Sequence, residues 1–244
     1  LSACMISIAT LLRRNGYLSL VRAGQWRVGR AVLAPVFKVS GSAFVEQVFM
    51  RIGFFAYAKI VAELGPTPYA THLICMNILN LSFCFGDGLG IAASALVGQK
   101  LGENRPDLSS IYGKVGQRIA FVCSSALFLL FIFGRHGLIR LFSPEDEIIA
   151  LGSVIMIIMA LSTHFQTSQV VLNGCLRGAG DSAFVAATSM LSIAVIRPIL
   201  TYVLCYPLGL GLPGAWISLV VDQGFRFLAG YTRFSGGKWS KIRL

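Results

Sequence analysis

Long apolar stretches separated by short polar connectors dominate the pattern of residues along the chain. A transmembrane α-helix needs about 20 consecutive, mostly apolar residues. Six stretches reach that length and predict membrane-spanning helices over residues 34–62, 69–99, 115–133, 148–173, 183–206 and 213–232. The apolar run over residues 1–12 is shorter and ends at Arg13 and Arg14, so it predicts the tail of a truncated helix. The pattern therefore predicts an all-α integral membrane protein with a six-helix transmembrane bundle over residues 34–232.

Basic segments flank the predicted bundle on both sides. Residues 13–33 carry five arginines, and residues 233–244 form a short tail with four further Lys and Arg residues. Basic segments next to a membrane span suit the anionic surface of the cytoplasmic leaflet. We therefore predict a cytoplasmic linker over residues 13–33 and a cytoplasmic tail over residues 233–244.

Composition supports membrane insertion and excludes an ordinary soluble domain. The chain is 55% hydrophobic and 13% charged, with a mean hydropathy of +0.73, outside the range of soluble proteins. A net charge of +11 would suit nucleic acid, but the basic residues gather between apolar spans, where membrane topology explains them better. Membrane lipid is the expected partner, and nucleic acid is not.

The distribution of Lys and Arg predicts the orientation of the bundle. Of 21 such residues, fifteen fall on one side of the predicted membrane, and three fall on the other: Lys59, Arg135 and Arg140. Short cytoplasmic loops carry the excess of positive charge. We predict that both ends of the chain are cytoplasmic and that the protein spans the plasma (inner) membrane several times.

Cysteine and histidine usage predicts no cofactor, metal site or catalytic centre. The six cysteines are scattered singly without a CxxC motif, and the three histidines are isolated from one another. Such cysteines most often pack as small hydrophobic residues. A membrane-embedded enzyme would need a metal cluster or a nucleophile and base at workable spacing, and neither residue type supplies one.

The stretch over residues 69–102 combines a packing face with a polar face. Gly86, Gly90, Ser94 and Gly98 recur every fourth residue and form a ridge along which another helix can approach closely. On an adjacent face, polar side chains stand at spacings of three and seven: Asn77, Asn80 and Asp87. A bilayer does not tolerate these groups against lipid, so this face should line a protein interior or a water-filled cavity.

Glu46 is the other acidic residue that we predict at mid-depth. It lies eleven residues from Pro35, and Asp87 lies eleven residues from Gly98 on the antiparallel second span. At 1.5 Å per residue both carboxylates are about 16 Å deep, and two carboxylates at one depth can bind a proton or Na⁺. A buried ion pair with Arg51 that only sets packing stays open as an alternative.

Three further charges lie inside predicted spans. Asp222 and Arg226 are four residues apart on the last span, which predicts a structural ion pair along one helix face. Arg197 precedes Pro198, whose missing N–H frees a carbonyl one turn back, so we predict that the guanidinium satisfies that loosened backbone.

The fourth span carries a polar stripe of Ser162, Gln166, Gln169 and Asn173, at spacings of four, three and four. Such amides either line a cavity or join helices by hydrogen bonds, and the spacing leaves both readings open. We assign Gln166, Gln169 and Asn173 to a substrate cavity, together with Gln47, Asn77 and Asn80.

Two longer motifs carry a family resemblance that covers the chain from about Pro35 to Trp239. GIAASALVGQKLG over residues 90–102 follows the second span, and NGCLRGAGD over residues 173–181 follows the fourth. With Arg197-Pro198 and Gly214-Ala215-Trp216, the chain resembles the multidrug and toxic compound extrusion (MATE) family of cation-coupled exporters.

The resemblance implies twelve helices in two six-helix lobes around a cleft, with Na⁺ or H⁺ driving export of a small, often cationic organic substrate. It implies that this chain is the C-terminal lobe and that an N-terminal lobe is missing from it. Glu46 matches an acidic residue of the family, whereas Gln166 stands where some members carry an acid.

Two alternatives keep this architecture. One is a flippase for lipid-linked saccharides. Its groove should be basic, whereas the three arginines predicted inside the spans are balanced by three acids. The other is an inactive half-transporter fragment.

Overall fold

The computed structural model describes residues 30–237 and residue 239, with side chains from residue 44 onward except that of Glu46. The truncated helix predicted over residues 1–12 and the linker up to residue 29 lie outside the described residues. The chain divides into two compact units, Leu1–Phe44 and Val45–Leu244. In the first unit, the described residues form the beginning of α2, and all contacts reported below belong to the second unit.

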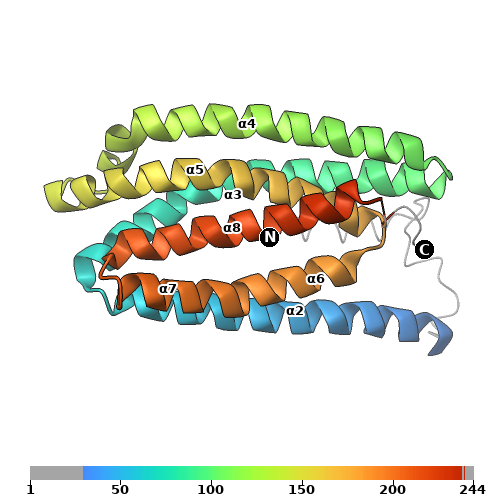
Figure 1. Ribbon diagram of the computed structural model, residues 1–244, viewed down its shortest axis with the longest axis horizontal. Helices are drawn as coiled ribbons and strands as arrows, with labels where there is room; N and C mark the ends of the chain where they lie inside the picture. The colour runs from blue at the N-terminus through green and yellow to red at the C-terminus, as the bar shows by residue number, and fades with distance from the viewer. Residues whose placement is uncertain (1–29, 238, 240–244) are drawn as a thin grey trace, which may run out of the picture. The chain divides into compact units, whose positions relative to one another are not determined.

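The described residues are almost wholly helical (Figure 1). In chain order the elements are α2 (Arg30–Ala62), α3 (Pro66–Gly102), α4 (Pro106–Arg140), α5 (Asp146–Gly178), α6 (Ser182–Leu191), the π-helical turn η2 (Ser192–Ile196), α7 (Arg197–Cys205) and α8 (Gly211–Ser235). Five predicted spans fall within one of these helices, and the span over residues 183–206 falls within the run from α6 to α7 apart from its last residue, Tyr206. The prediction of an all-α bundle is confirmed.

The helices run beyond the predicted apolar spans. Four of them are long and apolar enough to cross a membrane, namely α3, α4, α5 and the continuous run Ser182–Cys205. The apolar pattern stops at the first charged residues, whereas the helical hydrogen bonds continue past them. At the C-terminal end, α8 reaches Ser235, so the first residues of the predicted tail are helical.

Short connectors hold consecutive helices antiparallel. Gly180, between α5 and α6, has a φ of 85°, which glycine adopts without a steric cost. Between α7 and α8, the Tyr206 hydroxyl donates a hydrogen bond to Glu63 Oε2 at 2.6 Å. This hydrogen bond raises the pKa of Tyr206 to about 12 and ties the connector to the end of α2.

The fifth span is interrupted at its centre by the π-helical turn η2. The backbone N–H of Arg197 donates to the carbonyl of Ser192, five residues back. Pro198 has no N–H to donate, so the regular ladder cannot continue through this point, and a wider turn absorbs the defect.

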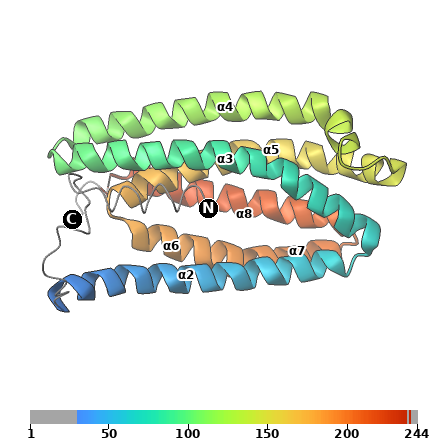
Figure 2. The ribbon, with the colours of Figure 1, turned by 180° about the vertical axis from the view of Figure 1, so that it is seen from behind.

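The small-residue ridge predicted on α3 is confirmed, and α5 supplies its partner. A Cβ atom added to Gly174 would lie 2.2 Å from the carbonyl oxygen of Gly90, and one added to Gly178 would lie 2.2 Å from that of Ser94. These distances are shorter than any real contact, so the two backbones touch. Figure 2 shows α3 and α5 running side by side along this part of the bundle.

The core has two apolar zones. One contains Ile155, Met156 and Met159 of α5 with Trp216 of α8. The other contains Val171, Leu172 and Leu176 farther along α5 with Phe234. Between these zones the buried residues are mostly polar, and we call the following set the buried polar layer: Ser162, Thr163, Gln166, Thr167 and Gln169 of α5, Ser192 of η2, Arg197 of α7, and Asp222, Gln223 and Arg226 of α8.

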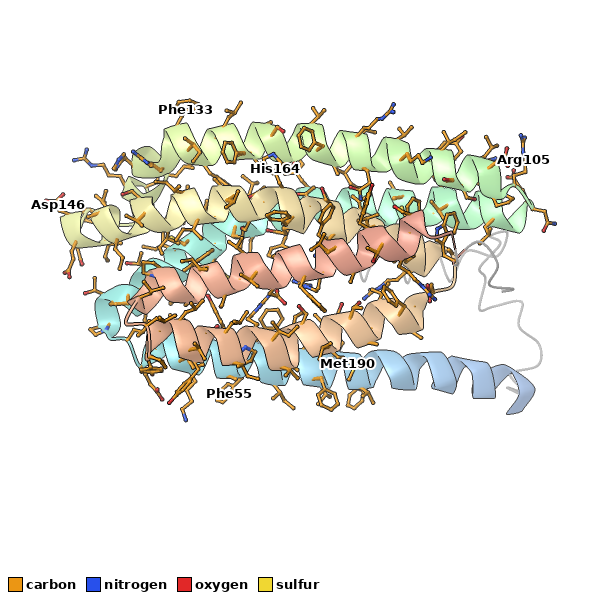
Figure 3. The ribbon with its side chains drawn as sticks, viewed as in Figure 1. Phe55, Arg105, Phe133, Asp146, His164 and Met190 are labelled. Atoms are coloured by element: carbon orange, nitrogen blue, oxygen red, sulfur yellow. The ribbon has the colours of Figure 1, made fainter. Side chains whose placement is uncertain are left out.

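Large apolar side chains cover the outside of the bundle. Phe55 and Phe133 are 74% and 83% exposed, and Figure 3 shows Phe133 pointing away from the helices. Such a surface suits lipid and not water. His164 instead lies between α4 and α5 (Figure 3), where its Nε2 is 3.3 Å from the Ser125 hydroxyl. His164 therefore contributes to the packing of α4 against α5.

Candidate functional site

A cavity of about 320 Å³ lies next to the buried polar layer. Helices α2, α3, α5, α6 and α8 all contribute to its wall. Its polar lining residues are Asp87 and Ser94 of α3, Gln169, Asn173 and Arg177 of α5, Ser189 of α6 and Arg226 of α8. A cavity with convergent polar groups at the meeting point of several helices is the usual form of a binding site.

Asp87 is the acidic residue in the wall of this cavity. It lies 21 residues after the start of α3 and 15 residues before its end, so it is about 30 Å and 22 Å from the two ends. Gly86 and Gly90, on either side of it in the sequence, are the residues that bring α3 against α5. The close packing of the two backbones therefore fixes where the Asp87 carboxylate stands.

The polar stripe of α5 continues the same wall. Asn173 Nδ2 donates to Gln169 Oε1 at 2.9 Å, and both side chains line the cavity. Ser162 instead donates back to the carbonyl of Met159 at 2.8 Å. The C-terminal part of the stripe therefore lines the cavity, as one of the two predictions had it, and its N-terminal part is buried in the bundle. Neither of these hydrogen bonds joins α5 to another helix.

A buried ion network borders the cavity. Arg226 donates to Asp222 at 3.0 Å, which confirms the predicted pairing along α8. Arg197 Nε donates to the same carboxylate at 3.2 Å, and its terminal nitrogen also bonds there. The other carboxylate oxygen accepts a hydrogen bond from Ser192. One acid thus holds two arginines, which leaves the cluster with a net positive charge.

The prediction that Arg197 satisfies loosened backbone is wrong. Its guanidinium reaches across to Asp222 on α8 instead of to a carbonyl of its own span. An ionised carboxylate is a stronger acceptor than a peptide carbonyl, and the π-helical turn closes the backbone without help from the side chain.

Several groups of the buried polar layer lack a hydrogen-bond partner within the described part of the chain. Both amide atoms of Gln166 are among them, and so are the amide nitrogen of Gln223 and Nε of Arg226. An unpaired buried polar group costs about 1–3 kcal/mol. A polar ligand or a rearrangement that supplied these groups with hydrogen-bond partners would therefore stabilise the buried polar layer.

The structure does not gather every predicted site residue at the cavity. Asn77 and Asn80 lie exposed on α3, and Gln47 and Arg51 lie exposed on α2, none of them in the cavity wall. Gln166 is buried beneath the wall. The side chain of Glu46 lies outside the described residues, so its distance from Asp87 stays a prediction.

The sequence reading missed Gln223, Ser189 and Ser192. Gln223 accepts a hydrogen bond from Arg226 at 3.0 Å, and its position next to Asp222 was an available signal. Ser189 and Ser192 are three residues apart in an apolar span, which marks one polar face, but nothing in the sequence shows that this face meets α8.

Comparison with known proteins places this architecture in a family. Residues 42–203 match the MatE family. The chain belongs to the MATE transporters. It is therefore a multi-pass membrane protein of a transporter family, and its bundle is one lobe of that fold.

Relatives of the chain carry multidrug resistance names. It is 26% identical over 247 residues to the probable multidrug resistance protein NorM of Thermotoga maritima, which covers 96% of this chain and 53% of the relative. It is 30% identical over 185 residues to the Shewanella oneidensis protein of the same name, covering 74% and 40%. This MATE chain spans about half the length of the curated relatives that it matches.

Solved MATE structures share the fold. A MATE transporter crystallised in a bent conformation superposes with a TM-score of 0.83 at 18% identity, covering 99% of this chain and 54% of that one. A eukaryotic MATE transporter, AtDTX14, gives a TM-score of 0.77 at 18% identity, covering 88% and 49%.

Proposed function

We propose that this chain forms one lobe of a secondary antiporter that exports small organic compounds, often cationic, in exchange for Na⁺ or H⁺. The observation that carries the proposal is the Asp87 carboxylate in the wall of a cavity that adjoins the buried polar layer. In transporters built from repeats, substrate and coupling-ion sites lie near the bilayer midplane at the repeat interface. Asp87, near the middle of α3, fits that position.

The chemistry of the cavity suits a competition between two cations for one carboxylate. Asp87 supplies the negative charge, Gln169 and Asn173 supply neutral amide dipoles, and Arg177 and Arg226 add positive charge to the same wall. Binding of Na⁺ or H⁺ to this carboxylate weakens its attraction for a cationic substrate. If the cation binds the outward-facing state better, it shifts the population toward that state and favours release of the substrate.

The ion network on α8 holds one side of the site. Asp222 engages Arg226 firmly enough to keep this cation in the cavity wall, where it raises the positive potential around Asp87. Glu46, at the same predicted depth, would be the second carboxylate of the coupling site.

The location of the protein and the orientation of its ends follow from the predicted membrane topology. We place the second lobe of the transporter across the cavity from this one, both ends of the chain in the cytoplasm, and the protein in the plasma (inner) membrane. No observation favours the flippase alternative, since the named relatives are multidrug resistance proteins.

The test is an efflux assay with the full-length protein in a host that lacks its own exporters, with and without a Na⁺ gradient and at two external pH values. We expect Asp87→Asn to abolish the dependence of efflux on the cation gradient while membrane insertion stays normal. Glu46→Gln should reduce the same dependence.

Asp146→Asn is the matched control, because it removes an exposed acid at the start of α5, away from both cavities. It should leave efflux unchanged. Cation-dependent efflux that survives Asp87→Asn undiminished would contradict the proposed role of this carboxylate.

A further inference from the structure

A second and larger cavity lies on the opposite side of α5 from the α3 ridge, between the beginning of α4 and the end of α8. Its volume is about 890 Å³, and its polar lining comes from α4: Asp107, Ser110, Lys114, Gln117 and Arg118. Aromatic residues close it from the other side: Tyr231, Phe234 and Trp239. It shares no lining residue with the cavity that contains Asp87, so the transport site does not account for it.

The charge of this cavity is positive and unbalanced. Lys114 and Arg118 stand four residues apart on α4, both exposed, and neither forms an ion pair within the described residues. Like charges at this spacing repel and destabilise a helix, so the pair favours an anion between them. Asp107 also lines the cavity, but it faces Arg105 at 3.7 Å.

The aromatic wall is rigid. Trp239 is 2% exposed, its Nε1 donates to the carbonyl of Phe234 at 2.7 Å, and the two rings stack with centroids 5.0 Å apart. The cavity is therefore a formed feature between α4 and α8 and does not depend on an extended side chain.

An apolar groove continues directly from the basic cavity. It has a volume of about 480 Å³ and shares Gln117, Arg118 and Tyr231 with the basic cavity. Beyond these shared residues it is lined by Phe121 and Val122 of α4, by Ser168 of α5 and by Phe227 of α8. Phe121 and Val122 are 60% and 68% exposed, so the groove opens on the outside of the bundle.

The depth of the two cavities matches the structure of a bilayer. Helix α4 has 35 residues and is about 52 Å long, while the hydrocarbon core is about 30 Å thick. If α4 is centred, its first 11 Å or so lie outside the hydrocarbon, so Lys114, about 12 Å from the start, stands at the boundary. Arg118, about 18 Å from the start, stands one turn inside it, from where its long side chain can extend back to the headgroups. The basic cavity then spans the boundary between headgroups and hydrocarbon, and the apolar groove lies among acyl chains.

We propose that this double cavity binds an anionic phospholipid. The phosphate sits between Lys114 and Arg118, with Ser110 as a neutral hydrogen-bonding group, and one acyl chain follows the groove past Phe121 and Phe227. Gln117 instead donates to the carbonyl of Ser168 at 2.8 Å and ties α4 to α5 between the two cavities. Basic pockets between transmembrane helices bind anionic headgroups in this way. A soluble phosphate compound would occupy the basic cavity alone and leave the adjoining apolar groove unfilled. A lipid fills both, and we therefore propose a lipid.

The test measures lipid binding and not transport, so its outcome is separate from that of the efflux assay. The full-length protein, delipidated in a neutral detergent, is titrated with dioleoyl phosphatidylglycerol, with dioleoyl phosphatidylcholine, and with inorganic phosphate or glycerol 3-phosphate. Bound lipid is counted by native mass spectrometry, and affinity is followed by the shift in Tm. We expect phosphatidylglycerol to bind at least tenfold more tightly than phosphatidylcholine.

Two variants and a matched control locate the site. Each Lys or Arg near a membrane surface strengthens binding of an anionic lipid about fivefold, so Lys114→Gln combined with Arg118→Gln should weaken phosphatidylglycerol binding about 30-fold. Arg135→Gln combined with Arg140→Gln removes the same charge from the other end of α4 and should leave it unchanged. Val122→Trp, which fills the groove, should weaken the lipid and spare any binding of glycerol 3-phosphate.

Three results would overturn the proposal. Equal affinity for the two lipids removes the charge argument, and equal losses in the two double variants show a general electrostatic effect. Inorganic phosphate that stabilises the protein as well as the lipid does would make the basic cavity a soluble-anion site.

Discussion

Asp222 is the residue on which the buried ion network depends. It is fully buried and accepts from both Arg197 and Arg226. Removing one partner of a buried ion pair costs about 3–5 kcal/mol, since the remaining charge is left uncompensated. We expect Asp222→Ala to lower the free energy of unfolding by at least this amount, measured by thermal unfolding in detergent.

The matched control for stability is Asp107→Asn, whose exposed pairing with Arg105 spans 3.7 Å. An exposed ion pair contributes about 0–1 kcal/mol, so this variant should unfold within a degree or two of the wild type. Similar losses in the two variants would mean that the arginines near Asp222 are not held by it.

Gln166 offers a second residue-scale prediction, in which stability and transport move in opposite directions. Its side chain is 1% exposed, and both amide atoms lack a partner among the described residues. Gln166→Leu replaces them with apolar atoms of similar volume, so the unfolding free energy should rise by about 1 kcal/mol. Efflux should fall, because the polar layer next to the cavity loses a group.

Gln169→Leu, one turn away on the same helix, is the comparison. It removes the acceptor of the 2.9 Å hydrogen bond from Asn173 and should lower stability by about 1 kcal/mol. If Gln166→Leu destabilised the protein to the same extent, its amide would have a partner in the folded state.

At the scale of helices, the contact between α3 and α5 sets the geometry of the cavity. Gly174→Ala would place a Cβ atom 2.2 Å from the Gly90 carbonyl oxygen, and only a shift of one backbone can relieve that overlap. Overpacking of this kind costs about 1–3 kcal/mol. We expect a lower Tm together with reduced efflux, because Asp87 moves with α3.

Gly88→Ala is the control on α3 itself. An added Cβ there meets nothing within 4 Å, and alanine is the better helix former by about 1 kcal/mol. This variant should be as stable as the wild type or slightly more so. A loss of stability equal to that of Gly174→Ala would remove the argument from close packing.

Features within one helix could be predicted from the sequence, and features between helices mostly could not. Hydropathy located the spans because lipid demands long apolar runs, and the ridge on α3 and the pair Asp222–Arg226 follow from helical periodicity. The partner of the ridge on α5, and the reach of Arg197 across to α8, depend on which faces meet. One sequence does not contain that information.

The candidate site shows the same division. Asp87, Gln169 and Asn173 were predicted because a polar residue in an apolar span needs shelter, and all three line the cavity. Asn77 and Asn80 satisfied the same criterion and lie outside its wall, and Asp87 is exposed as they are. Periodicity identifies a polar face, but the neighbouring helices decide which part of that face meets the cavity.

At the scale of the whole described bundle, two apolar zones enclose a polar layer. Residues such as Met156 and Trp216 form one zone and Val171 and Leu176 the other, while the charges of Arg197 and Asp222 are confined between them. Apolar packing at both levels stabilises the bundle, which allows the middle to retain unpaired polar groups. A bound ion can supply partners to these unpaired polar groups and so change their arrangement.

The orientation of this layered bundle in the membrane gives the last prediction. The helices alternate in direction, so the α3–α4 connector around Glu103 lies on one side of the bilayer and the α4–α5 connector around Glu145 on the other. The excess of Lys and Arg predicts that Glu103 faces the cytoplasm. In a full-length protein with its natural cysteines replaced, a membrane-impermeant maleimide applied to intact cells should label the Glu145→Cys variant and not the Glu103→Cys variant. After the cells are opened, both variants should be labelled. Labelling of Glu103→Cys alone in intact cells would contradict the predicted orientation, and the proposed lipid site would then lie in the outer leaflet.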